Sequence, residues 1–229
     1  MAPEPLNTLT PQTWTWNCIR PSEGWLDQCP PHRPVVWQAW LTDDQAILSR
    51  LTLLLSADEK ARLQRFRFRE DQQRFLIGRG LLRVFVGAQL KLPPERVELN
   101  YGPFGKPFAR SQISASSLQF NVSHSGKLVL LVFHRVHEVG VDVEQMRPGQ
   151  DWEAVAKRVF PAEEYRRWTL LNPQERFTAF FQIWTRHEAK LKTLGLGFSD
   201  ESESSQSARL VCFDLELPDG YQGAVGCLR

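Results

Sequence analysis

The sequence has no long hydrophobic run, few cysteines and no recognisable secretory signal. Its longest uninterrupted apolar stretch, Leu128 to Phe133, is far shorter than the about 20 residues that a membrane-spanning helix needs. The four cysteines form no CxxC pair, which predicts free thiols and excludes a dense disulfide framework. The N-terminus shows no basic start followed by an apolar core. We therefore expect a cytoplasmic protein without a membrane segment.

The net charge is also small, at +2 over 229 residues, which argues against nonspecific nucleic-acid binding by the whole surface. Basic residues are nevertheless concentrated between Asp58 and Arg83, where eight lysines and arginines accompany four acidic residues. Such an excess can hold a phosphate-bearing ligand or an acidic partner, and a solvated helix face explains it equally well. The length and the 42% hydrophobic content indicate a folded protein of one large domain or two small ones.

Strands and helices are both expected along the chain. An irregular leader, rich in proline and tryptophan, precedes a predicted strand at 35–41. Further strands are predicted at 118–125, 127–135 and 139–145, and the first two of these are joined by a tight turn around Ser125 and Gly126.

Helical periodicity is clearest in the second quarter of the chain and in the second half. A helix is predicted to begin at Ser56, which can cap it, while Glu59 completes a capping box. Arg62, Arg65 and Arg69 would then lie on one stripe of this helix. Other helical patterns cover residues 71–90, 151–160, 162–171 and 174–194.

Two carboxylates share one face of the predicted strand at 139–145. Because side chains alternate along a strand, Asp142 and Glu144 point to one side while Val141 and Val143 point to the other. Carboxylates this close repel each other unless a cation or a proton lies between them. Taken alone, the pair is explained more simply as an exposed polar strand face.

Two other polar segments stand out. Trp184, Glu188 and Lys192 recur at intervals of four on the last predicted helix, where the last two also suit an ordinary helix ion pair. The strand end at Ser123 and His124 lacks the orienting acid of a nucleophilic triad. The two hydroxyls of Ser123 and Ser125, the imidazole and the backbone N–H groups suit a bound anion, and a capped turn with a surface histidine is as good an interpretation.

Taken together, these segments resemble the Sfp-type 4′-phosphopantetheinyl transferases. FNVSHSG is similar to their FN(I/V)SHSG segment, GVDVE to their G(I/V)D(I/V)E strand, and WTRHEAKLK to their W(S/T)xKE(A/S)xxK helix. GKP at 105–107 and the stretch from Arg65 to Arg83, with its GRxLLR ending, match the family in order and spacing. The likeness extends from about Val35 to Phe198.

The resemblance implies an α+β fold of two similar subdomains related by a pseudo-twofold axis, with coenzyme A in the cleft between them. The subdomains would span residues 1–138, including the leader at 1–34, and 139–229. Members of the family transfer 4′-phosphopantetheine from coenzyme A to a serine of an apo carrier protein (acyl, polyketide or peptidyl). The by-product is adenosine 3′,5′-bisphosphate, and Sfp-type members act as monomers.

The resemblance also implies roles for individual residues. Asp142, Glu144 and Glu188 would hold Mg²⁺, and Glu188 would be the candidate general base for the carrier serine. Lys192 would contact the diphosphate of coenzyme A. Further coenzyme-binding positions are phosphate contacts at Ser123 and His124 (the latter at the 3′-phosphate), basic residues at Arg62 and Arg74, and the adenine loop at Gly105, Lys106 and Pro107.

The chain departs from the family pattern at His187, where the helix motif carries a lysine. A protonated His187 would supply the missing charge beside the diphosphate, and a histidine that faces solvent beside the site is the alternative.

Two other functions fit the same residues. One is a metal-dependent phosphohydrolase or nuclease that directs the carboxylates at water, and the other is a nonenzymatic phosphate- or nucleic-acid-binding module built on the basic stretch from Arg62 to Arg83. We expect the transferase, with no nucleic acid or membrane as a partner.

Overall fold

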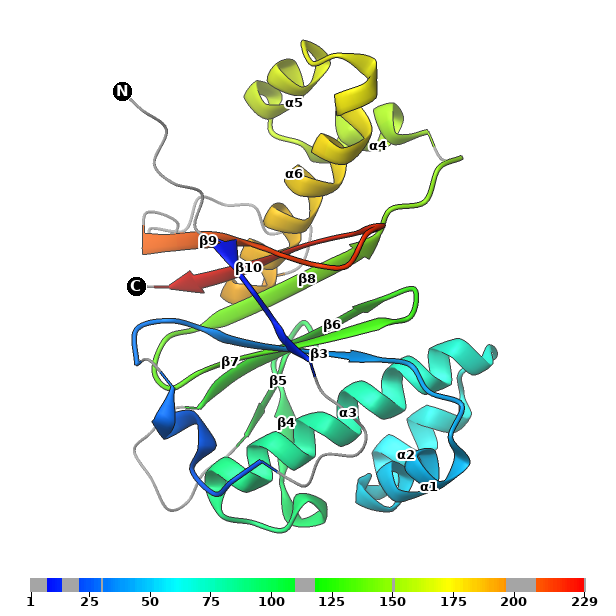
Figure 1. The fold of residues 1–229 in the computed structure, drawn as a ribbon, viewed down its shortest axis with the longest axis vertical. Coiled ribbons are helices and arrows are strands. Elements are labelled where there is room, and N and C mark those ends of the chain that lie inside the picture. Colours follow the sequence, from blue (N-terminus) through cyan, green and yellow to red (C-terminus); the bar gives the residue numbers. More distant parts are fainter. Residues whose placement is uncertain are drawn as a thin grey trace.

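The structure is a computed structural model that describes residues 8–13, 21–29, 31–109, 118–149, 151–196 and 209–228. Two four-stranded sheets pack against each other in the middle of the molecule, and helices cover their outer faces (Figure 1). The separate helices and mostly antiparallel strands make this an α+β fold, which confirms the predicted class. Within the described ranges, no helix is long and apolar enough to cross a membrane.

The first sheet has the strand order β2-β3-β7-β6. β3 pairs antiparallel with β7, and β7 pairs with β6 through a tight turn at Gly126 and Lys127. A two-stranded hairpin of β4 and β5 accompanies it. The strands are Gln12–Thr13 (β2), Val35–Trp40 (β3), Leu99–Tyr101 (β4), Pro107–Ala109 (β5), Gln119–Ser125 (β6) and Leu128–His134 (β7).

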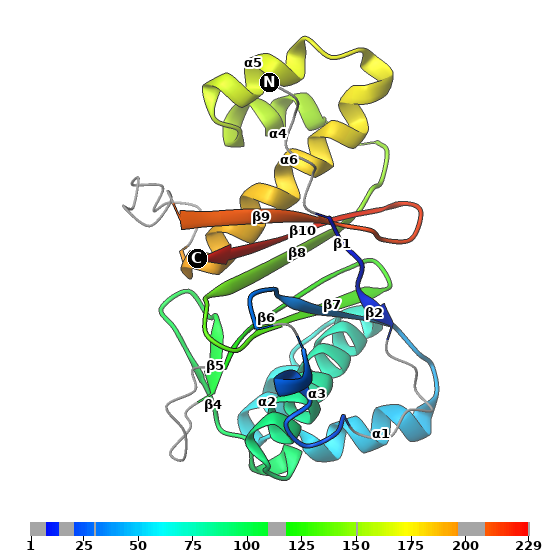
Figure 2. The ribbon, with the colours of Figure 1, turned by 60° about the vertical axis from the view of Figure 1, so that its left-hand side comes forward.

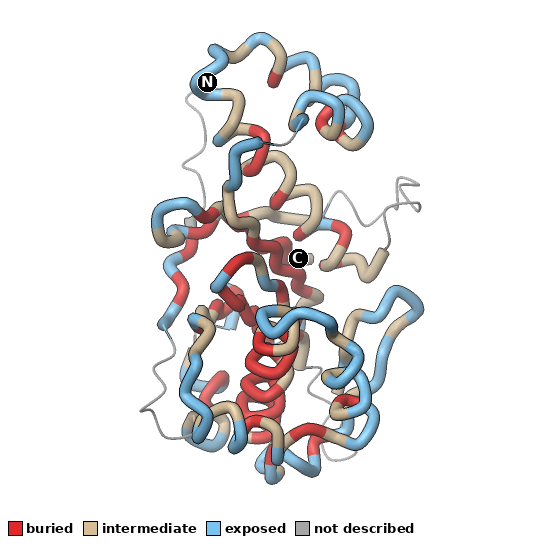
Figure 3. Tube along the Cα trace, turned by 90° about the vertical axis from the view of Figure 1, so that its right-hand side faces the viewer, coloured by how far each residue is buried: buried red, intermediate tan, exposed pale blue. Residues whose placement is uncertain are grey.

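The long helix α3 (Arg69–Leu90) covers the outer face of the first sheet, and most of its length is buried (Figure 3). Phe85 on α3 packs against Phe133 on β7 with ring centroids 5.4 Å apart. The shorter helical elements of this half are η1 (Trp25–Gln28), α1 (Gln45–Leu54), α2 (Ala57–Gln64) and η2 (Pro94–Arg96).

The second sheet has the order β1-β9-β10-β8, and α6 crosses its outer face. The helices α4 and α5 pack against α6 through an aromatic cluster centred on Phe180. The elements are Thr8–Leu9 (β1), Val139–Gln145 (β8), Trp152–Val159 (α4), Ala162–Thr169 (α5), Pro173–Leu194 (α6), Leu210–Leu215 (β9) and Tyr221–Leu228 (β10).

An apolar core joins the two sheets. Val36 and Leu130 of the first sheet pack in one buried cluster with Val141 and Val225 of the second. Because this core fixes the sheets against each other, the edge strands β6 and β8 come to lie side by side.

The leader takes part in both sheets. β1 pairs parallel with β9, and a few residues later β2 pairs parallel with β3 (Figure 2). Leu9 is buried in the core between the sheets. The leader was expected to be irregular and to belong to the first half, whereas its described part also extends the sheet of the second half.

Several predictions for the elements can be compared directly with the structure. The capping box is confirmed, since the Glu59 carboxylate accepts the Ser56 N–H at 3.0 Å. The single arginine stripe is wrong: α2 ends at Gln64, and Arg69 begins the next helix. Helix α1 was not predicted. The cysteines within the described ranges, Cys29, Cys212 and Cys227, are free thiols as expected, and Cys18 lies outside those ranges.

Candidate active site

The site lies where the edge strands β6 and β8 meet, beneath the C-terminal half of α6. A cavity of about 420 Å³, here called the carboxylate pocket, opens at this point. Most of the predicted chemical groups converge on it from three separate segments of the chain. Its lining residues are Val122, Ser123, His124, Asp142, Glu144, Trp184, Glu188 and Lys192.

Asp142 is the most deeply buried carboxylate of the pocket, with 3% of the residue exposed. The Lys192 ammonium lies 2.6 Å from its Oδ1 atom, and the Ser123 hydroxyl donates to the same oxygen at 3.0 Å. Asp142 Oδ2 and Glu188 Oε1 are buried and accept no hydrogen bond. The pocket therefore holds carboxylate oxygens whose negative charge is only partly compensated.

Burial raises the pKa of Asp142, Glu144 and Glu188 above the usual carboxyl range. The neighbouring carboxylates add to this rise at Glu144 and Glu188, whereas the Lys192 ammonium lowers the pKa of all three groups. The balance leaves Glu188 with a pKa of about 7. Such a group accepts or releases a proton close to neutral pH.

Glycine allows α6 to approach the strand that carries the carboxylates. A Cβ on Gly140 would come within 2.5 Å of the Ala189 carbonyl oxygen and closer still to the Thr193 amide nitrogen. The opposite residue in β10, Gly226, also faces Ala189 and Thr193. Because neither glycine carries a side chain, Lys192 can reach Asp142 across a short gap.

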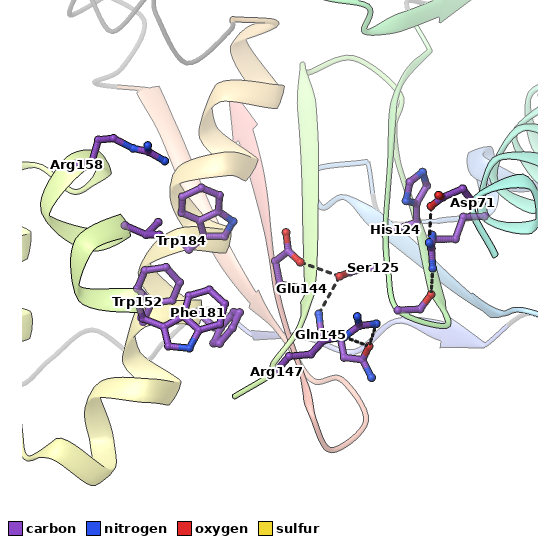
Figure 4. Close-up of a pocket in the computed structure, with 14 residues that line it drawn as sticks. Asp71, His124, Ser125, Glu144, Gln145, Arg147, Trp152, Arg158, Phe181 and Trp184 are labelled. Atoms are coloured by element: carbon purple, nitrogen blue, oxygen red, sulfur yellow. Dashed lines mark hydrogen bonds and ion pairs between the residues drawn. The ribbon is translucent and has the colours of Figure 1, made fainter. Parts of the chain in front are cut away.

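A second and larger cavity, of about 620 Å³, adjoins the carboxylate pocket and shares His124, Glu144 and Trp184 with it (Figure 4). We call it the aromatic cavity, because Trp152 and Phe181 form part of its wall. The remaining lining residues are Asp71, Arg74, Ser125, Gly126, Gln145, Arg147, Val155, Arg158 and Phe180.

Arg74 enters this cavity from α3. Its guanidinium donates to the Gly126 carbonyl oxygen at 2.7 Å and pairs with Asp71 at 2.5 Å. Arg74 therefore holds the β6–β7 turn beside His124. Burial lowers the pKa of His124, and the cations Arg74 and Lys192 lower it further. An anion placed among these groups would reverse that effect.

Comparisons with known proteins identify the family of this chain. A model for the N-terminal domain of 4′-phosphopantetheinyl transferases matches residues 38–135, and the model of the 4′-phosphopantetheinyl transferase superfamily matches residues 138–217. The chain is 38% identical over 168 residues to the 4′-phosphopantetheinyl transferase HetI of Nostoc sp. strain PCC 7120, which covers 73% of this chain and 71% of the relative.

Two Bacillus proteins are also similar. The 4′-phosphopantetheinyl transferase psf-1 of Bacillus pumilus is 36% identical over 176 residues, covering 75% of this chain and 72% of the relative. Sfp of Bacillus subtilis strain 168 is 29% identical over 175 residues, covering 75% of each chain. The chain belongs to the 4′-phosphopantetheinyl transferase superfamily. It is a transferase of the Sfp type that moves phosphopantetheine to carrier proteins, and its family acts on coenzyme A.

The other positions predicted to bind coenzyme A, Arg62 and the loop at 105–107, line neither of the two cavities. The Arg62 guanidinium stacks over the Phe75 ring, next to Arg74 in the chain, at 5.2 Å from the centroid. Lys106 donates to Glu138 at 2.7 Å and to the Thr193 carbonyl oxygen at 3.0 Å. The loop with Gly105 and Pro107 is thereby attached to the C-terminal end of α6.

The structure does not bring His187 to the carboxylates. It lines a different cavity, of about 360 Å³, together with Arg186, Lys190 and Asp214. Adjacent helix residues point about 100° apart, so a helix that directs Glu188 into the carboxylate pocket turns His187 away. The expectation that His187 supplies charge beside the diphosphate receives no support from this placement.

Sequence reasoning missed some residues and contacts around the two cavities. Ser125 donates to Glu144 at 2.7 Å, and strand alternation from Ser123 could have revealed it. Phe180 and Phe181 lie four and three residues before Trp184, which is the spacing of one helix face. Arg147 and Arg158 offered no comparable signal, because only the folded chain brings them to a cavity that they share with residues of β6.

The pocket can be compared with the needs of a divalent cation. Among the described residues, no three acidic, histidine or cysteine side chains form a preassembled metal-binding group. The buried oxygens without a hydrogen bond on Asp142 and Glu188 nevertheless belong to the donor class that Mg²⁺ prefers. In this arrangement the Lys192 ammonium donates a hydrogen bond to the other oxygen of Asp142. The residues therefore fit a cation chemically, while their ligating geometry is not preformed.

Proposed function

We propose that this transferase uses Mg²⁺ to move 4′-phosphopantetheine from coenzyme A to a serine of an apo carrier protein, releasing adenosine 3′,5′-bisphosphate. One observation carries the proposal. Three carboxylates, of which Asp142 is buried, and a lysine converge from β8 and α6 beside His124 and the Ser123 hydroxyl of β6 in a single pocket. Transfer from a diphosphate needs an anion-binding group next to a cation-binding group, and this pocket contains both.

Asp142, Glu144 and Glu188 are the proposed Mg²⁺ ligands. The oxygens of Asp142 and Glu188 that lack hydrogen bonds support this assignment, because a buried carboxylate without a partner is unfavourable. When bound, Mg²⁺ would neutralise charge on the diphosphate as the bond to phosphorus breaks. Lys192, which reaches Asp142 across the pocket, is the proposed diphosphate contact.

Glu188 is the proposed general base. Its pKa of about 7 suits a group that takes the proton of the carrier serine near neutral pH. The serine oxygen would then attack the β-phosphorus of coenzyme A, and adenosine 3′,5′-bisphosphate would leave with the electrons of the broken P–O bond.

The residues on the first half would bind the phosphates and the adenine. His124 and Arg62 are the proposed partners of the 3′-phosphate, and Ser123 is a further phosphate contact. Arg74, which holds the β6–β7 turn, is the second basic position of this group. The loop at 105–107 is the proposed adenine contact.

The remaining assignments concern the whole molecule. We propose the subdomains 1–138 and 139–229 as the two halves that enclose coenzyme A, in a monomer located in the cytoplasm. The pI of about 8.4 suits an acidic carrier protein as partner, because opposite charge speeds encounter. Acyl, polyketide and peptidyl carriers all fit this description.

A single incubation separates the proposal from its alternatives. The protein is mixed with coenzyme A, Mg²⁺ and an apo acyl carrier protein, and the intact carrier is weighed by mass spectrometry. A gain of one phosphopantetheine group, abolished by a chelator, is expected. Coenzyme A that is hydrolysed without a mass gain on the carrier would indicate a phosphohydrolase. Coenzyme A that stays intact, with binding unchanged in Asp142→Ala, would indicate a binding module.

A further inference from the structure

The strands β6 and β8 are edge strands of different sheets that face each other with no main-chain ladder between them in the described structure. Unpaired edge strands normally need some device that satisfies their N–H and C=O groups. In this protein the device consists of side chains. From Asn121 onward, every second residue of β6 reaches across to β8, and these residues are Asn121, Ser123 and Ser125.

Two side chains of this row accept hydrogen bonds from N–H groups at the edge of β8. The Val141 N–H donates to Asn121 Oδ1 at 3.2 Å, and the Gln145 N–H donates to Ser125 Oγ at 3.1 Å. The period of two residues is the same in both strands, so the two N–H groups point toward β6 and meet its inward-facing side chains. The side chains thus replace the main-chain bonds that a continuous sheet would have.

The same row also holds the carboxylates. Ser123 Oγ donates to Asp142 Oδ1 at 3.0 Å, and Ser125 Oγ donates to Glu144 Oε2 at 2.7 Å. The single hydroxyl proton of Ser125 is therefore used on Glu144, and its oxygen accepts from Gln145. A phosphate would need that same proton, so Ser125 is better suited to orient Glu144 than to bind an anion. Ser123 differs, because Lys192 pairs with the same Asp142 oxygen, so this hydroxyl can turn to a phosphate without leaving that oxygen unpaired.

We propose that Asn121, Ser123 and Ser125 form a side-chain ladder that positions the β8 carboxylates against the phosphate-binding end of β6, with Ser125 as the positioning residue for Glu144. This role rests on the proposed Mg²⁺-dependent function. It differs from that of His124, whose side chain points to the other face of β6. The ladder would set both the distance between the halves and the direction of one proposed metal ligand.

Three variants test the role of Ser125. Ser125→Ala removes the hydroxyl, and Ser125→Thr keeps it. Thr52→Val is the matched control, because it removes a hydroxyl that donates to the Leu48 carbonyl oxygen in α1 and contacts no proposed ligand. Binding of Mg²⁺ to each protein in the presence of coenzyme A is measured by calorimetry, and the Mg²⁺ dependence of carrier modification gives the apparent KM and kcat.

We expect Ser125→Ala to weaken Mg²⁺ binding by about tenfold or more, which is the usual effect of removing a residue that orients a metal ligand. Its apparent KM for Mg²⁺ should rise more than its kcat falls. Ser125→Thr should bind Mg²⁺ nearly as well as the parent, and Thr52→Val should be unchanged. Parent-like Mg²⁺ binding by a folded Ser125→Ala protein would overturn the proposal, as would a failure of Ser125→Thr to restore binding.

Two further outcomes are informative. If Ser125→Ala does not fold, Ser125→Cys retains the volume with a much weaker donor, and it should show the same loss of Mg²⁺ affinity. Failure of both variants to fold would overturn the proposal, because the ladder would then be purely structural. A parent protein that neither binds Mg²⁺ nor modifies a carrier would instead contradict the proposed function itself, and with it the role of the ladder.

Discussion

Single residues determine the electrostatics of the carboxylate pocket. Asp142 is nearly inaccessible to solvent, and one of its oxygens is compensated by Lys192 and Ser123. Its second oxygen and one oxygen of Glu188 remain without hydrogen bonds. Because burying an uncompensated carboxylate is costly, the free protein keeps Glu188 partly protonated, and a bound cation would remove that proton.

Proton release on Mg²⁺ binding follows from the raised pKa of Glu188. With a pKa of about 7, this group is about half protonated at neutral pH, and cation binding favours its ionised form. Mg²⁺ affinity should therefore fall as the pH decreases below 7. Calorimetry in two buffers of different ionisation enthalpy measures the released protons, and Glu188→Gln is the control that should release fewer. An identical heat in both buffers would contradict the assignment of Glu188 as a ligand.

His124 should distinguish coenzyme A from its 3′-dephospho form. Hydrogen bonds to charged groups contribute about 1.5–3 kcal/mol, so His124→Ala should weaken the binding of coenzyme A by tenfold or more. The affinity for 3′-dephospho-coenzyme A should change much less, since it lacks the phosphate that His124 is proposed to bind. Calorimetric titration of both ligands gives the comparison. Equal losses would remove His124 from this role.

At this scale, the sequence was most informative where strand alternation applies. Asp142 and Glu144 point to the same pocket, as alternation predicts. The same rule would have placed Ser125 beside Glu144, a contact that was not predicted. His187 was assigned to the site through its position in a motif, although helix geometry turns it away from Glu188. Contacts such as that between Arg74 and the Gly126 carbonyl oxygen join segments that are distant in the sequence. They can therefore be recognised only in the folded structure.

At the scale of elements, local signals predicted most helices and strands. Strand pairings between distant segments of the chain were not predicted. Helix α2 was recognisable because its capping box is complete within four residues. Helix α1 had a usable signal as well, since Asp44 accepts from two backbone N–H groups at its start. The two-residue strands β1 and β2 offered none, because their partners lie far along the chain.

The close approach of α6 to β8 makes Gly140 sensitive to substitution. Adding a Cβ there would clash with the backbone of α6 at Ala189 and Thr193, which cannot yield without moving the helix. Gly140→Ala should lower the free energy of unfolding by about 1–3 kcal/mol, the usual range for overpacking, and should also weaken activity by displacing Glu188. Urea denaturation and the transfer assay measure the two effects.

Gly102→Ala is the matched control for this prediction. A Cβ at Gly102 would meet only the Lys106 carbonyl oxygen, at an ordinary 3.7 Å. Its stability should stay within about 0.5 kcal/mol of the parent. If Gly140→Ala were as stable and as active as this control, the packing argument would be wrong.

At the scale of the whole molecule, the leader and the central core hold the two sheets in one arrangement. Leu9 lies in the core between the sheets, and its carbonyl oxygen accepts the Glu216 N–H at 3.0 Å. A few residues later, Thr13 accepts from Gln38 of the first sheet at 2.8 Å. The leader therefore connects both halves directly, which no local pattern in its sequence indicated.

Shortening Leu9 should destabilise the protein. Leu9→Ala removes buried apolar volume between the sheets, and such changes cost about 2–5 kcal/mol. The exposed residue Gln12, in the same leader, provides the control variant Gln12→Ala, which should change stability by less than about 0.5 kcal/mol. Chemical denaturation at constant pH compares the two. Equal stabilities would mean that the leader does not help to hold the sheets together.

The central claim is that phosphopantetheine transfer takes place where β6, β8 and α6 meet. A crystal structure with coenzyme A and Mn²⁺ in place of Mg²⁺ tests it most directly, because anomalous scattering locates the metal without any assumption about its ligands. The account predicts one metal peak bonded to carboxylate oxygens of Asp142, Glu144 and Glu188, with the diphosphate between that peak and His124. A metal and diphosphate bound elsewhere, for example in the cavity beside His187, would contradict it.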